Sequence, residues 1–132
     1  MSASRSPFSY AILRIVPHVE RGECFNAGVV LFCRQRDFLG AQVALDESRL
    51  AALAPEASAA ELREALDGLV RVAAGDPAAG PIAAMPASER FGWLVAPSST
   101  VIQPSEVHTG LSDEPANTLE ALFDELVAPR HR

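Results

Sequence analysis

The segment CFNAGVVLFC, from Cys24 to Cys33, decides the fold of this chain. It is short, almost entirely apolar and rich in aromatic and β-branched residues, which is typical of a strand inside a sheet. The segment FSYAILRIV, residues 8–16, has the same character and precedes it across the connection 17–23, which contains a proline and a glycine. A polar turn then leads to a third candidate strand, residues 38–45. Three strands joined by short connections predict an antiparallel meander.

Helical periodicity replaces the strand pattern in the middle of the chain. Ser58 and Glu61 have the spacing of a capping box, and apolar residues recur after them at helical intervals until a Gly-Asp-Pro run. A short helix is expected over 87–95, a short strand over 100–103 and a last helix over 115–127. This order of elements predicts an α+β domain, in which the helices pack on one face of the antiparallel sheet.

The length and composition fit a single domain. The 132 residues are 48% hydrophobic, which is ample for one core, and residues 1–7 and 128–132 are expected to be flexible ends. No apolar stretch approaches the roughly 18 residues that cross a bilayer, and no signal peptide is recognisable. We therefore expect a cytoplasmic protein without a membrane partner. Cys24 and Cys33 would lie about 30 Å apart on one strand, so no disulfide is expected between them.

The charged residues exclude several functions. The net charge is −6, which disfavours binding of nucleic acid through phosphate contacts. All 11 basic residues are arginines, so a Walker A phosphate loop and a lysine-bound pyridoxal cofactor are excluded. No histidines, cysteines or acids stand at the spacing of a metal-ligand motif. We expect neither a metal nor a cofactor.

Polar side chains are predicted on one face of the first hairpin. The pairs expected on this face are Arg14 with Asn26, Ile12 with Gly28 and Tyr10 with Val30. An arginine beside an asparagine can hold a carboxylate or phosphate through two hydrogen bonds, and Gly28 would leave space for a ligand. Tyr10, Arg14 and Asn26 are therefore candidate ligand-binding residues, with Arg21 at the rim. The structural alternative is that Arg14 pairs with Glu23 or a helix acid, and that Asn26 holds the loop backbone.

The candidates for catalysis are fewer. His108, in an expected loop over 104–111, and Glu23, at the rim of the polar face, could each serve as a general base. The alternative for His108 is a loop histidine bonded to the backbone. No nucleophile elbow, carboxylate pair or dinucleotide fingerprint accompanies these residues. The sequence does not decide whether the protein is an enzyme.

Several motifs resemble an uncharacterised bacterial family catalogued as a domain of unknown function. The first is Tyr10-x-Ile12-Leu13-Arg14-x-x-Pro17 with Arg21-Gly22-Glu23-x-x-Asn26-x-Gly28-Val29-Val30-Leu31-Phe32; the second is Trp93-Leu94-Val95-Ala96-Pro97 with Thr100-Val101-Ile102-Gln103 and Val107-His108-Thr109-Gly110-Leu111. The resemblance spans nearly the whole chain. It implies a stand-alone bacterial protein with, at most, a HipA-like kinase as a protein partner, and it implies no activity.

Two functions from different classes remain open. The first is a non-catalytic cytoplasmic binding or partner-interaction domain, which would receive its partner on the polar face or at the sheet edges. The alternative is an enzyme that acts on an anionic small molecule or a nucleic-acid end. It would hold the charge with Arg14 and Arg21 and use His108 or Glu23 as the base. That alternative requires Arg14, Asn26 and His108 to converge in one concave pocket. A homodimer that buries the polar face is a third alternative.

Overall fold

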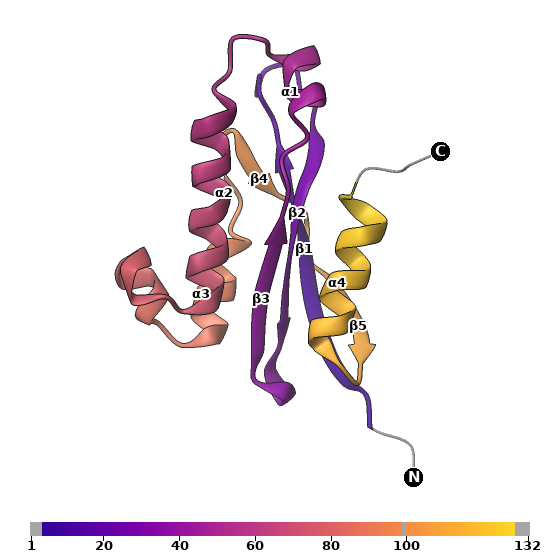
Figure 1. Ribbon diagram of the computed structural model, residues 1–132. Coiled ribbons are helices and arrows are strands. Elements are labelled where there is room, and N and C mark those ends of the chain that lie inside the picture. The colour runs from indigo at the N-terminus through magenta and orange to yellow at the C-terminus, as the bar shows by residue number, and fades with distance from the viewer. Residues whose placement is uncertain (1–3, 99, 129–132) are drawn as a thin grey trace.

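The computed structural model of this chain describes residues 4–98 and 100–128. A five-stranded antiparallel sheet forms the middle layer, and helices lie on either side of it (Figure 1). The predicted α+β class is therefore confirmed. In the described part of the chain, no helix is both long enough and apolar enough to span a bilayer.

The sheet begins with the predicted meander. β1 (Ser6–Ile15), β2 (Phe25–Cys33) and β3 (Phe38–Val43) pair in chain order. β3 forms one edge of the sheet, while β4 (Ile102–Pro104) and β5 (His108–Ser112) share the other edge, where both pair with β1. β1 thus begins inside the segment that was expected to be a flexible end. The remainder of the two expected ends falls largely outside the described residues.

The described residues form four α-helices. They are α1 (Glu47–Leu53), α2 (Ala59–Ala74), α3 (Ala87–Leu94) and α4 (Pro115–Leu126), and short 3-10 turns occupy η1 (Arg34–Arg36), η2 (Pro77–Ala79) and η3 (Pro81–Ala84). Ser58 Oγ accepts a hydrogen bond from the Glu61 N–H at 3.2 Å, as the capping box predicts. Gly75 ends α2 with a φ of 74°, a conformation that glycine adopts without strain. The sequence predicted α2, α3 and α4, but it did not predict α1.

The helices cover both faces of the sheet, and the expectation of a single covered face is wrong. α2 and α3 pack on the face that carries Leu13 and Val30, and α4 packs on the opposite face, which carries Val29 and Leu31 (Figure 1). Val29, Val30 and Leu31 are each 0% exposed. Because successive strand residues point to opposite faces, β2 is apolar on both faces, and each face requires a cover.

A β-bulge between β1 and β2 changes the expected register. Arg14 lies opposite Asn26 as predicted, but β2 carries one extra residue, Ala27, before the pairing resumes. Beyond the bulge the pairs are Leu13 with Gly28, Ile12 with Val29 and Tyr10 with Leu31. The expected pairs of Ile12 and Tyr10 were therefore wrong by one residue, because a bulge leaves no clear signal in an apolar run.

The bulge also moves Gly28 to the face covered by α2. A Cβ at Gly28 would lie 2.8 Å from Val43 Cγ1 and 3.3 Å from Leu13 Cδ1. Core side chains therefore occupy the space that was expected to admit a ligand. The glycine lets β3 approach β2 closely, which is a packing role.

Ser105 joins the two short strands β4 and β5 to β1. Its N–H donates to Ile12 O at 2.8 Å, and the Ile12 N–H donates to Ser105 Oγ at 2.9 Å. Ser105 is only 6% exposed. Its hydroxyl thus replaces a strand carbonyl at the place where the edge strand is interrupted, and it satisfies a backbone donor that has no access to water.

Candidate functional site

The predicted ligand-binding residues share one face of the sheet, beside α4. Tyr10 packs with the α4 cluster, and Arg14 lies four residues further along the same strand. Asn26 lies opposite Arg14 and contacts α4. His108 on β5 pairs with Tyr10, and the centroids of the two rings are 5.2 Å apart. The sequence therefore placed Tyr10, Arg14 and Asn26 on the correct common face, whereas His108 was expected in a loop.

These residues form two separate groups on that face. Tyr10 and Arg14 are about 13 Å apart along β1, because a strand rises about 3.3 Å per residue. The His108 ring packs beside Tyr10 at a tilt of 34°, while Asn26 lies beside Arg14. Neither of the two cavities described below is lined by any of the four. The ligand-binding roles of these residues stay a prediction.

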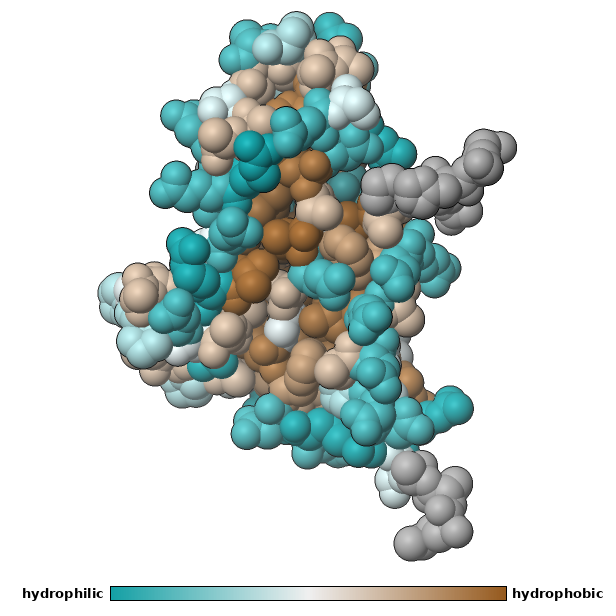
Figure 2. Space-filling view, viewed as in Figure 1, coloured by the Kyte–Doolittle hydropathy of each residue, from teal (hydrophilic) through white to brown (hydrophobic). Residues whose placement is uncertain are grey.

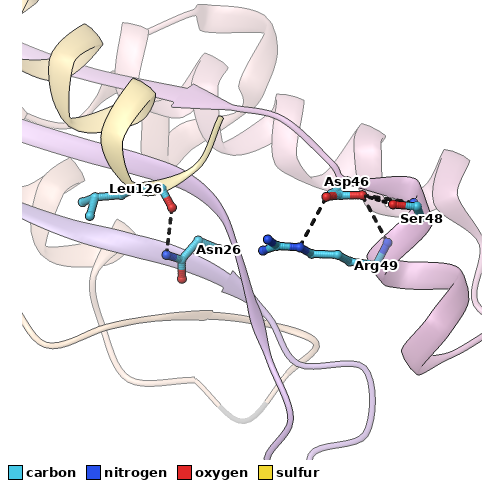
Figure 3. Close-up of polar contacts among 5 residues, drawn as sticks. All are labelled: Asn26, Asp46, Ser48, Arg49 and Leu126. Carbon is cyan, nitrogen blue, oxygen red and sulfur yellow. Dashed lines mark hydrogen bonds and ion pairs between the residues drawn. The ribbon is translucent and has the colours of Figure 1, made fainter. Parts of the chain in front are cut away.

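Asn26 connects the sheet to the end of α4. Its Nδ2 donates to the carbonyl of Leu126, the last residue of α4, at 3.0 Å (Figure 3). The last carbonyls of a helix have no partner within their own helix, so the Asn26 side chain supplies a hydrogen-bond donor to the C-terminal end of α4. Arg14 is half-buried and makes no ion pair with any described residue. Glu23, which was considered as a partner for Arg14, pairs with Arg21 instead.

Arg21 and Glu23 form an exposed pair on the connection between β1 and β2. Arg21 Nε donates to Glu23 Oε1 at 2.7 Å. This hydrogen bond, with the charge of the guanidinium, lowers the pKa of the Glu23 carboxyl and raises the pKa of Arg21. A carboxylate with a lowered pKa is a weaker base. The pair therefore weakens the case for Glu23 as a general base.

His108 has an acidic neighbour, Glu106, on the strand edge. His108 Nε2 lies 3.6 Å from Glu106 Oε1, and their side chains are 42% and 79% exposed. An ion pair this open to water contributes little to stability. The described residues contain no group of three histidines, cysteines or acids that could hold a metal ion. Cys24 is an exposed free thiol and Cys33 a buried one.

Two cavities that were not predicted from the sequence lie away from the predicted residues. One, of about 480 Å³, runs along α4 and is lined by three acids, Asp113, Glu114 and Glu125. Such a lining repels the anionic ligand that was expected. The other, of about 410 Å³, lies between α2, the end of α3 and β4, and no charged residue lines it. The sequence signal for the second cavity was the small residue Ala65 on α2.

The open edge of the sheet at β3 is the second feature that the sequence did not reveal. β3 has the sequence FLGAQV, with no charge and no proline, and all six of its residues are partly exposed. Figure 2 shows a hydrophobic strip between hydrophilic borders on this side of the molecule, which Figure 1 shows to be the side of β3 between α2 and α4. Edge strands normally carry charges, prolines or bulges that prevent further pairing. β3 has the composition of a central strand at an edge position.

Comparison with known proteins assigns the family. A family model described as a protein of unknown function (DUF3037) matches residues 10–127. No curated protein and no solved structure matches the chain. The matched segment contains every strand residue from Tyr10 onward and all four helices. The chain therefore belongs to the DUF3037 family of proteins of unknown function.

Proposed function

We propose that this chain is a non-catalytic cytoplasmic bacterial domain that binds another protein through the open edge of its sheet. In this proposal an extended segment of the partner pairs with β3 and adds a strand to the sheet. The observation that carries the proposal is the uncharged, partly exposed strand β3 at an edge, between two helices.

The backbone of β3 supplies the hydrogen bonds for such a partner. The Ala44 N–H donates to Ala27 O at 2.8 Å, next to the ladder between β2 and β3. Because alternate residues of an antiparallel strand bond to the same neighbour, the N–H and C=O groups of Leu39, Ala41 and Val43 point away from β2. In the described part of the chain, β3 pairs with β2 alone. These outward groups are therefore available to an added strand.

The α4 border of the open edge is acidic, whereas the α2 border carries charges of both signs. Thr118 of α4 is hydrogen-bonded to Ser112 of β5, so the opposite side of α4, which carries the exposed residues Glu120 and Asp124, faces β3. On α2 the corresponding residues are Arg63, which is paired with Glu47, and Asp67. The partner segment is therefore expected to be apolar and extended, with basic residues at its flanks.

A second copy of the chain fits this edge less well. Antiparallel pairing of β3 with β3 of another copy is a two-fold arrangement in which like surfaces meet. It would bring the two α4 helices together with their acids facing each other, which is unfavourable. We therefore favour a different protein as the partner over a homodimer.

The enzyme alternative receives less support from the geometry. Arg14 and His108 share a sheet face, but about 13 Å of strand separates their positions. Glu23 is held by Arg21, and the cavity along α4 is acidic. No described residue near Arg14 or His108 completes a catalytic group.

Ala41→Pro is the variant that tests the proposal. Proline retains the Cβ of Ala41 but removes the outward N–H, and prolines are tolerated at such edge positions. Ala41→Ser is the matched control, because it keeps the N–H. A random peptide library is selected on the immobilised wild-type protein, and the Kd of each enriched peptide is measured for all three forms.

We expect extended apolar peptides with basic flanks, bound equally by wild type and Ala41→Ser and at least about tenfold more weakly by Ala41→Pro. Circular dichroism of Ala41→Pro establishes that the variant is folded. Peptides that bind all three forms equally, or no enrichment at all, would contradict the proposal. Sedimentation velocity across a wide concentration range addresses the homodimer, and a dimer abolished by Ala41→Pro would overturn the choice of partner.

A further inference from the structure

We infer that the cavity between α2, α3 and β4 is a binding site for an uncharged, largely apolar small molecule that contains a flat ring. This site lies on the opposite face of the sheet from Tyr10 and Arg14, and it is separate from the open edge at β3. Binding of a small molecule at this site would therefore be a function in addition to partner binding.

The lining of the cavity determines the class of ligand. The floor is formed by Leu13 and Leu94, which are 1% and 5% exposed, and Leu69 of α2 and Ile102 of β4 form walls. Among the described residues, no charged side chain lines the cavity, so a charged ligand would lose its hydration without gaining a partner. The volume of about 410 Å³ is within the range of small-molecule sites.

The space exists because α2 presents small residues on this side. Ala65 lines the cavity, and Gly68 lines a neighbouring hollow of about 350 Å³ that shares Ala65, Leu69 and Trp93 with it. A Cβ built on Gly68 meets only one atom, 3.9 Å away on Arg71. The helix therefore leaves the region around Trp93 unfilled, where a larger side chain would have completed the core.

Trp93 belongs to the lining of both hollows, and its exposure is unusual. It lines both of them, yet it is 47% exposed. Large aromatic side chains are usually well covered, and an indole face is a good surface for stacking a flat ring. A flat ring of the ligand that stacks on Trp93 would remove apolar surface of both the ligand and the indole from water.

The mouth of the cavity is polar. Ser98 Oγ and Thr100 Oγ1 line it and lie 2.8 Å apart, and Thr100 Oγ1 donates to Ile102 O at 3.0 Å. Gln103 Nε2 donates to Thr100 O at 2.9 Å. The hydroxyls of Ser98 and Thr100 can meet one polar group on the ligand. The site is thus apolar inside and polar at one end, as small-molecule sites usually are.

Trp93 is the single tryptophan of the chain, so its emission reports on the surroundings of this one side chain, which lines the cavity. The probe is N-phenyl-1-naphthylamine, an uncharged aromatic dye that absorbs where tryptophan emits. We expect saturable quenching of Trp93 with one dye bound per chain. The anionic analogue 1-anilinonaphthalene-8-sulfonate, which has the same rings and a sulfonate group, is expected to bind more weakly.

Ala65→Leu fills the cavity, and Ala60→Leu is the matched control. Both positions are exposed on α2, but only Ala65 lines the cavity. We expect Ala65→Leu to weaken dye binding by about tenfold or more, and Ala60→Leu and Ala41→Pro to leave it unchanged. An absence of saturable quenching, or equal binding by Ala65→Leu and wild type, would overturn the inference. If Ala41→Pro alone lost dye binding, the dye would bind at β3. That result would also overturn the inference about the cavity, but it would leave the proposed partner site unchallenged.

Discussion

Replacing Ser105 with alanine should destabilise the protein well beyond the usual effect of losing a hydroxyl. The variant removes the acceptor of the Ile12 N–H, at 2.9 Å, and the donor to Glu106 O, at 2.8 Å. Ile12 is 9% exposed and Ser105 is 6% exposed, so water cannot easily replace the lost acceptor. A buried donor without a partner costs about 1–3 kcal/mol.

The expected shift in melting temperature follows from the length of the chain. At about 2.1 cal/mol/K per residue, unfolding 132 residues has an entropy near 0.28 kcal/mol/K. A loss of about 1–3 kcal/mol therefore lowers the Tm by about 4–11 °C. Differential scanning calorimetry and urea unfolding measure the two quantities independently.

The control is Ser98→Ala, which removes an exposed hydroxyl with hydrogen bonds of similar length, 2.8 and 3.2 Å. It should change the free energy of unfolding by less than about 0.5 kcal/mol. If Ser105→Ala is as stable as Ser98→Ala, then the Ile12 N–H does not depend on the serine hydroxyl. The account of the interrupted edge strand would then be wrong.

Three further predictions concern packing, pH and the end of α4. Gly28→Ala should lower the free energy of unfolding by about 1–3 kcal/mol, because the new Cβ would lie 2.8 Å from Val43 Cγ1. The control Gly92→Ala, whose Cβ would meet nothing within 4 Å, should stabilise α3 by about 0.5–1 kcal/mol in urea unfolding. Equal effects of the two substitutions would refute the packing role of Gly28. The hydrogen bonds from Ser48 and the Arg49 N–H lower the pKa of Asp46 at the start of α1 (Figure 3). The ionised Asp46 carboxylate therefore stabilises the folded protein fully above the ordinary aspartate pKa of about 3.9. This contribution is lost as the pH falls through the lowered pKa of Asp46 in the folded protein. Asp46→Asn keeps the helix cap at every pH, so its stability should fall less in acid than that of the wild type. If the free energies of unfolding of the two proteins fall in parallel with pH, the Asp46 carboxylate does not contribute to the acid sensitivity. Asn26→Ala should lower stability by about 0.5–1.5 kcal/mol and speed hydrogen exchange in the last turn of α4; unchanged exchange there would show that the bond to Leu126 does not hold the helix end.

Local patterns in the sequence were sufficient where one element determines its own structure. The meander and the helices α2, α3 and α4 follow from strand composition, caps and helical spacing. The shared face of Tyr10, Arg14 and Asn26 follows from the two-residue period of a strand. These features depend on neighbours in the sequence, so the sequence alone predicts them.

Features that depend on distant partners were not predictable. β5, HTGLS, reads as a loop because it is polar and contains a glycine, and only its pairing with β1 makes it a strand. The extra residue Ala27 leaves no compositional trace. Whether β3 is central or at an edge depends on β4 and β5 joining β1 instead, and the cavity at Trp93 depends on how α2 and α3 lie together.

The pairing of the first strand with the last one determines when this protein can finish folding. Ser6 of β1 pairs with Ser112 of β5, so the strand made first waits for almost the entire chain before its second neighbour exists. During synthesis the meander of β1, β2 and β3 therefore has two open edges, and its apolar faces lack α4 altogether. Contacts this distant in sequence slow folding, and they leave the nascent chain exposed to wrong pairing. A truncated message that ends before β5 would leave the core strand β1 at an unprotected edge, and such fragments are expected to aggregate or to be degraded.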